Sequence, residues 1–153
     1  VSGLTREQAK EKINNYISSV IPEEIKLNNV RILLAEDNML NAEIAMTLLA
    51  DANAYVELAP DGEKALSMLK RATDGYYDLI IMDIQMPHMN GYEATKNIRG
   101  LPDGRCRIPI IAMTANAFEE DRKRAIESGM NGYVTKPIKI EELISTIKKI
   151  LKS

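Results

Sequence analysis

The stretch of sequence that decides the fold is DLIIMDIQMPHMNG, residues 78–91. Its apolar run 79–82 leads directly into Asp83, and the turn signals Met86-Pro87 and Asn90-Gly91 follow. A short, branched apolar run bounded by turn residues is typical of a strand buried on both faces, as in a parallel sheet. The sequence therefore predicts a central strand that ends in a carboxylate.

Outward from this strand, short apolar runs alternate with amphipathic stretches. We expect strands over residues 30–35, 54–58, 78–82, 108–113 and 132–135. The helices that follow them are expected over residues 39–49, 92–99, 118–128 and about 140–152, with one more that follows the turn at residues 60–62 and ends at about Arg71. A (βα)5 chain with right-handed crossovers covers both faces of its sheet. The prediction is an α/β fold with a doubly wound parallel five-stranded sheet in the flavodoxin-like order 2-1-3-4-5.

Residues 1–28 do not share the strand–helix alternation of the rest of the chain. Thr5 and Gln8 fit a capping box. Apolar residues then recur at helical spacing up to Pro22, which ends the pattern; they are Ile13, Tyr16, Ile17, Val20 and Ile21. We expect an N-terminal amphipathic helix and linker over residues 1–28 and the main domain over residues 29–153.

Composition excludes several classes of protein. The chain has 153 residues, a formal net charge of −2 and 45% hydrophobic residues, which is typical of a globular domain and not of a binder that holds nucleic acid by charge alone. Cys106 is the only cysteine, which excludes an internal disulfide and a Cys-rich zinc site and favours a reducing compartment. No apolar run approaches the ~20 residues that cross a membrane.

Polar residues follow four of the predicted strands, and they are Glu36, Asp37, Asp83, Thr114 and Lys136. In an open α/β sheet, ligands bind outside the carboxyl ends of the strands, where these side chains would meet. Each residue has a plainer reading when taken alone. Asp37 or Thr114 would serve as a helix cap, Asp83 as a turn residue, and Lys136 as an exposed lysine. The convergence of four strand ends favours a functional site.

Three neighbouring carboxylates repel one another by about 4 kcal/mol per pair at 4 Å and an effective dielectric of 20. This repulsion predicts a hard divalent cation, and Mg²⁺ suits a site of carboxylates and phosphate oxygens. Lys136 would balance one carboxylate or a phosphoryl oxygen. Asp83 ends the most buried strand and is already ionised at neutral pH, so we expect it to be the nucleophile that forms an aspartyl phosphate.

These residues resemble the receiver domain of two-component response regulators. Four landmarks match in order, and they are LAEDN at 34–38, IMDIQMPHMNG at 81–91, IIAMTA at 110–115 and YVTKP at 133–137. The resemblance covers residues 30–152. It implies that Asp83 is the phosphoacceptor for a phosphohistidine and that Thr114 and Lys136 contact phosphoryl oxygens.

The resemblance also implies a metal site, a switch and a partner. Asp37, Asp83 and the backbone carbonyl of Gln85 would bind Mg²⁺, with Glu36 acting through water. Tyr133 would be a switch aromatic that moves inward when Thr114 shifts, although half-buried packing is its plainer reading. The phosphodonor would be a histidine kinase or a histidine phosphotransfer domain, with no direct contact to nucleic acid or to a membrane.

Because Ser153 closely follows the last helix, the receiver is expected to be either free-standing or the C-terminal module of a hybrid histidine kinase. The helix expected over residues 5–21 resembles a connector from a kinase core and favours the hybrid kinase. The location would then be cytoplasmic, including the cytoplasmic part of a membrane-bound sensor. By itself the chain would be no enzyme beyond self-catalysed phosphotransfer and dephosphorylation. Two alternatives stay open, a phosphorylation-independent pseudo-receiver that acts as a docking module and an aspartate-nucleophile phosphatase. Such phosphatases usually place an acid where Gln85 stands.

Overall fold

The computed structural model describes residues 5–12, 26–115 and 118–152, and it contains one parallel sheet. The strands are β1 (Arg31–Ala35), β2 (Tyr55–Ala59), β3 (Leu79–Asp83), β4 (Ile110–Thr114) and β5 (Gly132–Thr135). Their order is β2-β1-β3-β4-β5 and every neighbouring pair is parallel. The predicted fold class is therefore confirmed, with strand limits shifted by no more than two residues.

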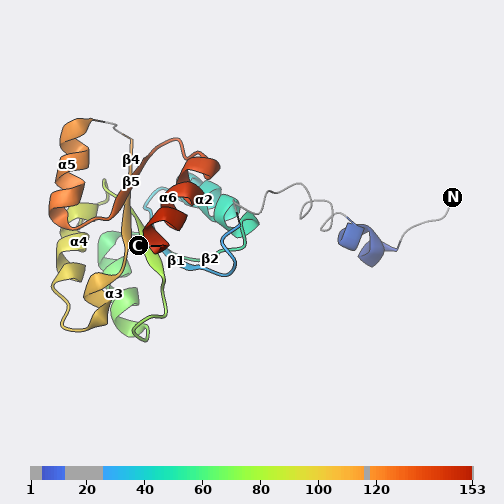
Figure 1. The fold of residues 1–153 in the computed structure, drawn as a ribbon, viewed down its shortest axis with the longest axis horizontal. Helices are drawn as coiled ribbons and strands as arrows, with labels where there is room; N and C mark the ends of the chain where they lie inside the picture. The colour runs from blue at the N-terminus through green and yellow to red at the C-terminus, as the bar shows by residue number, and fades with distance from the viewer. Residues whose placement is uncertain (1–4, 13–25, 116–117, 153) are drawn as a thin grey trace.

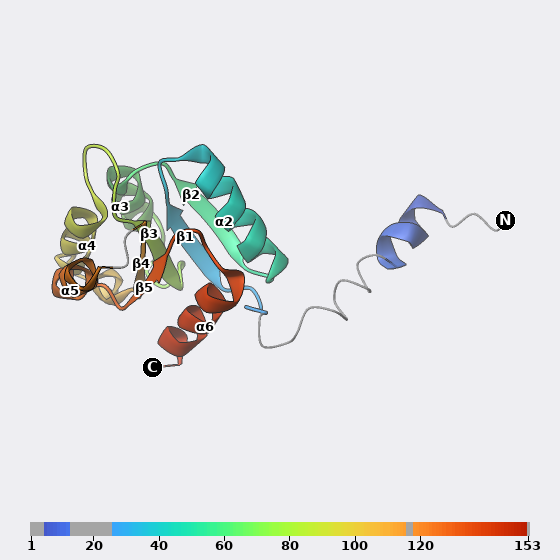
Figure 2. The same cartoon turned by 90° about the horizontal axis from the view of Figure 1, so that it is seen from above.

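Helices cover both faces of the sheet (Figures 1 and 2). They are α2 (Met39–Asp51), α3 (Gly62–Arg71), α4 (Gly91–Arg99), α5 (Glu119–Ser128) and α6 (Ile140–Leu151). Helices α2 and α6 pack on one face through Leu49 and Ile144, and α3, α4 and α5 pack on the other through Leu69, Ile98 and Ala125. The sheet is thus the middle layer of three.

The central position of β3 explains its sequence. Its five residues are all buried, because helices cover both faces and β1 and β4 flank both edges. The parallel register pairs Leu34 with Ile81 and Ile81 with Ile111. Carboxyl ends of in-register parallel strands lie at one edge of the sheet, so the residues after β1, β3 and β4 are brought together there.

The start of α4 lies unusually close to the end of β3. The Gly91 nitrogen donates a hydrogen bond to the Ile84 carbonyl at 2.9 Å. A Cβ atom on Gly91 would lie 2.5 Å from the carbonyl oxygen of Asp83, which is too close for any side chain. Asn90 and Glu93 complete a capping box at the same turn. Residues 84–90 therefore form a loop that is fastened at both ends.

Arg99, at the C-terminal end of α4, connects this helix to residues 106–108 and 129–131. Its Nε donates to the Gly129 carbonyl at 2.9 Å, and its Nη1 donates to the carbonyls of Cys106 at 2.8 Å and Ile108 at 2.7 Å. Its Nη2 donates to the Asn131 side-chain oxygen at 2.8 Å. All three guanidinium nitrogens therefore have acceptors.

Two regions add to the sequence analysis. A 3-10 helix, η2 (Gly104–Arg107), lies between the helix expected over residues 92–99 and the strand expected over residues 108–113, and it contains Cys106. At the N-terminus, a helix covers residues 6–12, and the predicted capping box of Thr5 and Gln8 is formed. The apolar pattern of residues 13–21 and Pro22 lie outside the described residues. In the described part of the chain, no helix is long and apolar enough to cross a membrane.

Candidate functional site

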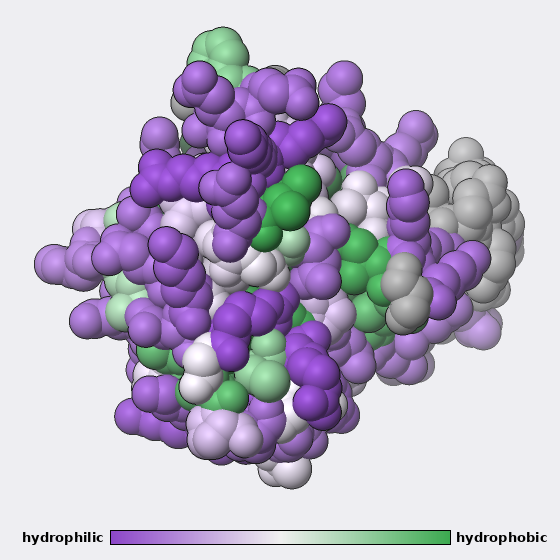
Figure 3. All heavy atoms as spheres, turned by 60° about the vertical axis from the view of Figure 1, so that its left-hand side comes forward, coloured by the Kyte–Doolittle hydropathy of each residue, from purple (hydrophilic) through white to green (hydrophobic). Residues whose placement is uncertain are grey.

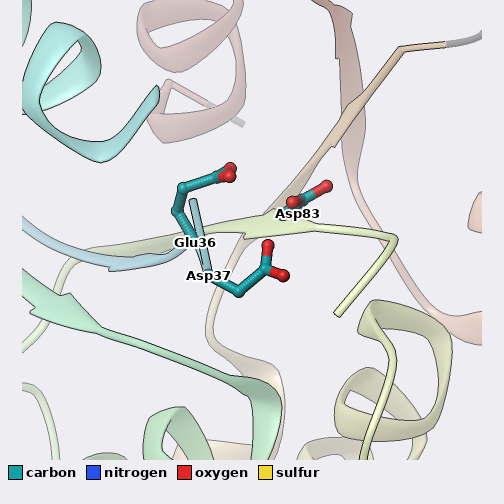
Figure 4. Close-up of side chains that lie close together, drawn as sticks. All are labelled: Glu36, Asp37 and Asp83. Carbon is teal, nitrogen blue, oxygen red and sulfur yellow. The ribbon is translucent and has the colours of Figure 1, made fainter. Parts of the chain in front are cut away.

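Three carboxylates meet at the carboxyl edge of the sheet. Glu36 and Asp37 follow β1 and Asp83 ends β3, and one oxygen from each lies within 4.8 Å of the others. Figure 4 shows the three side chains around a common space. Glu36 and Asp83 are buried, whereas Asp37 is exposed. The reading of Asp37 as a helix cap is wrong, because the side chain of Asn38 caps α2 by accepting from the Asn41 nitrogen.

Lys136, which directly follows β5, is shared by two of these acids. Its Nζ lies 3.2 Å from Oδ2 of Asp83 and 3.1 Å from Oε2 of Glu36. The backbone N–H of Gln85 donates to the other oxygen of Asp83 at 3.3 Å, and the N–H of Asn38 donates to Oε1 of Glu36 at 3.2 Å. Lys136 is therefore part of the site and not a freely exposed lysine.

Thr114 and Tyr133, the two predicted switch residues, belong to β4 and β5. Thr114 ends β4, is 4% exposed and lines a cleft with Asp37. It does not cap α5, whose N-cap residue is Phe118. Tyr133 in β5 is half-buried, and the guanidinium carbon of Arg122 lies 5.2 Å from its ring centroid.

The charges at this edge are unbalanced. Burial raises the pKa of Asp83 to about 6, and repulsion from Glu36 adds to the increase while Lys136 opposes it. Burial alone would lower the pKa of Lys136, but attraction to Asp83 and Glu36 outweighs it and raises that pKa. One ammonium among three carboxylates leaves the folded protein with uncompensated negative charge.

The donor set fits a hard divalent cation. Oε2 of Glu36 is buried and accepts no hydrogen bond from the described residues, so its contact with Lys136 is that of an ion pair alone. Asp37 and Asp83 present further carboxylate oxygens to the same space. Clustered carboxylate oxygens, with room for water at the exposed side, are typical ligands of Mg²⁺.

A cleft of about 550 Å³ opens beside the acidic cluster. Its lining combines residues of the predicted site with residues of the loop after β3 and of two helices. These are Asp37, Ile84, Gln85, Met86, Pro87, Asn90, Tyr92, Thr114, Asp121 and Arg124. Sequence reasoning missed Asn90, Tyr92, Asp121 and Arg124, because only the packing of α4 against α5 brings them to the cleft.

A smaller pocket of about 100 Å³ lies on the other side of Lys136. It is lined by Asn41, Ile44, Lys136, Pro137 and Ile138. Met39 and Leu40, at the start of α2, are 64% and 66% exposed, and Ile44 on the same helix is 46% exposed. The charged site therefore has an apolar rim on its α2 side.

Comparison with known proteins agrees with this geometry. Residues 32–148 match the family model described as response regulator receiver domain. A relative in Dictyostelium discoideum, hybrid signal transduction histidine kinase B, is 38% identical over 152 residues, which cover 92% of this chain and 7% of that kinase. This chain therefore spans only a small part of that kinase.

Solved structures give the same assignment. The receiver domain of a sensor histidine kinase from Pseudomonas aeruginosa, with a magnesium ion coordinated in its active site cleft, matches with a TM-score of 0.73 and 39% identity over 82% of this chain and 99% of that chain. A co-crystal structure from Saccharomyces cerevisiae, of a histidine phosphotransfer protein with the receiver domain of its downstream response regulator, matches with a TM-score of 0.69 and 30% identity over 80% and 88%. The fold, the family match and these relatives together lead to one conclusion: the chain belongs to the response regulator receiver domain family.

Proposed function

We propose that this domain accepts a phosphoryl group from a phosphohistidine onto Asp83 and changes its surface in response. The observation that carries the proposal is the ammonium of Lys136, 3.2 Å from Asp83 and 3.1 Å from Glu36, at the carboxyl edge of the sheet. A buried acid that is held beside a cation and an open cleft is placed to bind and receive an anionic group.

Asp37, Asp83 and the backbone carbonyl of Gln85 would hold Mg²⁺ directly, and Glu36 would act through water. When bound, the ion would neutralise part of the charge that accumulates around the transferred phosphoryl group. The clustering of the three acids within 4.8 Å supports this assignment. The magnesium-bound receiver from Pseudomonas aeruginosa supports it independently.

In the proposed transfer, an oxygen of Asp83 attacks phosphorus, a P–O bond forms and the P–N bond of the phosphohistidine breaks. The imidazole leaves and its nitrogen is protonated by solvent. Lys136 and the Thr114 hydroxyl would stabilise the phosphoryl oxygens. No general base is required, because Asp83 is mostly ionised near neutral pH even with its pKa raised to about 6.

The same phosphoryl group would act as a switch. It adds about −1.5 to −2 charge at a position next to Thr114. An inward movement of the Thr114 hydroxyl would free space for Tyr133, which already packs against the α3–α4–α5 core. The surface that β5 shares with its neighbouring helices would then differ between the two states.

The partner would be a histidine kinase or a histidine phosphotransfer domain. The apolar rim formed by Met39, Leu40 and Ile44 supports this, because exposed apolar side chains beside a reactive group favour protein docking. We further propose that residues 1–28 are a linker segment, that residues 29–153 are the receiver and that the parent protein is a hybrid histidine kinase. A Leu40→Glu variant should slow transfer from a phosphohistidine domain and leave transfer from a small phosphodonor unchanged.

The direct test is incubation with phosphoramidate and Mg²⁺, followed by intact-mass measurement. The native chain should gain one phosphoryl group, and chelator or Asp83→Asn should abolish the adduct. Asp51→Asn, which neutralises an exposed carboxylate at the end of α2, should leave it intact. A phosphatase would instead release many phosphates per chain, and a pseudo-receiver would form no adduct.

A further inference from the structure

The cleft beside the acidic cluster has an outer wall that the phosphotransfer proposal does not use. Tyr92 of α4 and Asp121 and Arg124 of α5 form this wall, and Asp37 and Gln85 line the same cleft. Arg124 is the one cation in the cleft lining formed by described residues, since Lys136 borders the separate smaller pocket. An anion that approaches Asp83 through this cleft would pass Arg124.

Arg124 is held in place by an aromatic ring. Its guanidinium carbon lies 4.3 Å from the centroid of the Tyr92 ring, which is a cation–π contact. Tyr92 is only 5% exposed, and its hydroxyl lies 3.5 Å from the Asp121 carbonyl oxygen, so the ring is a fixed platform. Stacking uses the face of a guanidinium and leaves its N–H groups available in the plane.

Among the described residues, none accepts a hydrogen bond from these N–H groups or forms an ion pair with them. The Arg124 side chain is exposed. This differs from Arg99, whose guanidinium nitrogens all donate to protein oxygens. A positioned, solvent-accessible guanidinium with available donors is suited to bind phosphate or sulfate oxygens.

We propose that Arg124 forms an anion subsite in the outer cleft that captures the phosphoryl group of an incoming phosphodonor before transfer. The proposal extends the proposed function. It rests on that function because the captured anion is the phosphoryl group of a phosphodonor. Arg124 would act as a positioning residue, since Asp37 and Asp121 make the rest of the lining negative and would otherwise repel a phosphate. Its contribution is to donor capture and not to the chemical step.

The first test is the rate of phosphorylation by acetyl phosphate and Mg²⁺ at low ionic strength. Arg124→Gln should lower the apparent second-order rate constant by about threefold to tenfold, and the deficit should shrink as salt screens the charge. The maximal rate at saturating donor should change little. Arg124→Lys should recover part of the loss.

Lys123→Gln provides the matched control. It removes the same charge from an exposed neighbouring position of α5 that is not part of the cleft lining. Figure 3 shows that the face carrying α4 and α5 is mostly hydrophilic, so a general effect of surface charge would appear in both variants. Equal losses in Lys123→Gln and Arg124→Gln, or no loss in Arg124→Gln, would overturn the proposal.

A second measurement separates this inference from the proposed function. Sodium sulfate is titrated into ¹⁵N-labelled protein with Mg²⁺ present, and the side-chain Nε–H resonances of Arg122 and Arg124 are followed. A saturating shift at Arg124 with little change at Arg122, which stacks on Tyr133 outside the cleft, supports the subsite. Parallel shifts at both arginines overturn it. If the native chain accepts no phosphoryl group, the proposed function fails while the sulfate titration still decides the subsite.

Discussion

The protein contains two polar clusters in partly buried surroundings, and they are built in opposite ways. Around Arg99, each guanidinium nitrogen donates to an uncharged carbonyl or amide oxygen between 2.7 and 2.9 Å away. Around Asp83, three carboxylates share one lysine, and an oxygen of Glu36 accepts no hydrogen bond from the described residues. The first cluster should stabilise the fold, whereas the second should destabilise it until a cation binds.

Removal of Arg99 should give the largest effect. Arg99→Ala leaves the carbonyls of Gly129, Cys106 and Ile108 without their donor, and we expect the free energy of unfolding to fall by about 3–4 kcal/mol. Urea denaturation followed by circular dichroism measures this change. Arg107→Ala, at an exposed position of η2, is the control and should change stability by less than about 0.5 kcal/mol. Similar losses in both variants would remove the contrast between the clusters.

Neutralising Asp83 should act in the other direction. Its pKa in the folded protein is raised to about 6, so ionised Asp83 is disfavoured, and Asp83→Asn should raise the free energy of unfolding by about 3 kcal/mol at pH 7.5 with chelator. Asp37→Asn should give a smaller increase, because Asp37 is exposed. Asp51→Asn should have no effect. A loss of stability in Asp83→Asn would mean that its pairing with Lys136 outweighs the repulsion.

The pH dependence follows from the same raised pKa. Between the ordinary pKa of 3.8 and about 6, the folded state binds a proton at Asp83 that the unfolded state does not, so this group favours folding as the pH falls. The stability advantage of Asp83→Asn over the native sequence should therefore shrink from about 3 kcal/mol at pH 7.5 toward zero near pH 4. If the free energies of unfolding of the two proteins changed in parallel across this pH range, the raised pKa of Asp83 would be contradicted.

The smallest effect should come from magnesium itself. At a concentration ten times its Kd, Mg²⁺ should stabilise the native sequence by about 1.4 kcal/mol through mass action. Asp83→Asn and Asp37→Asn should respond much less, and Arg99→Lys should respond as the native chain does. Thermal denaturation with and without Mg²⁺ measures this difference. An equal stabilisation by Mg²⁺ in every variant would mean that the cation binds at another site.

The strands were predictable because each carries its own local signal. The apolar run before Asp83 reads as a buried strand without any knowledge of its neighbours, and β3 is found there with all its residues buried. The 3-10 helix η2 was missed because Gly104–Arg107 has no hydrophobic periodicity. Its conformation depends instead on contacts such as the Arg105 side chain with the Leu69 carbonyl.

The site was predictable only to the extent that topology places strand ends together. The sequence predicted that Glu36, Asp83 and Lys136 would meet, and they do. It predicted that Lys136 would balance one carboxylate, whereas the structure pairs Lys136 with two, Glu36 and Asp83, which lie 100 and 53 positions away in the chain. The contact between Arg124 and Tyr92 could not be predicted from the sequence, since the distance between them depends on how two helices pack.

The close approach of Gly91 to Asp83 has a consequence for how this protein can be redesigned. The segment 84–90 lies on the surface, where insertions are ordinarily well tolerated. Here, however, an added residue would have to lift the first turn of α4 away from the strand end and break the bond between Gly91 and Ile84. An engineer who wishes to graft a sensor peptide or a fluorophore tag should therefore leave this loop at its native length and choose the turn around Gly75, where a Cβ atom would meet nothing within 4 Å.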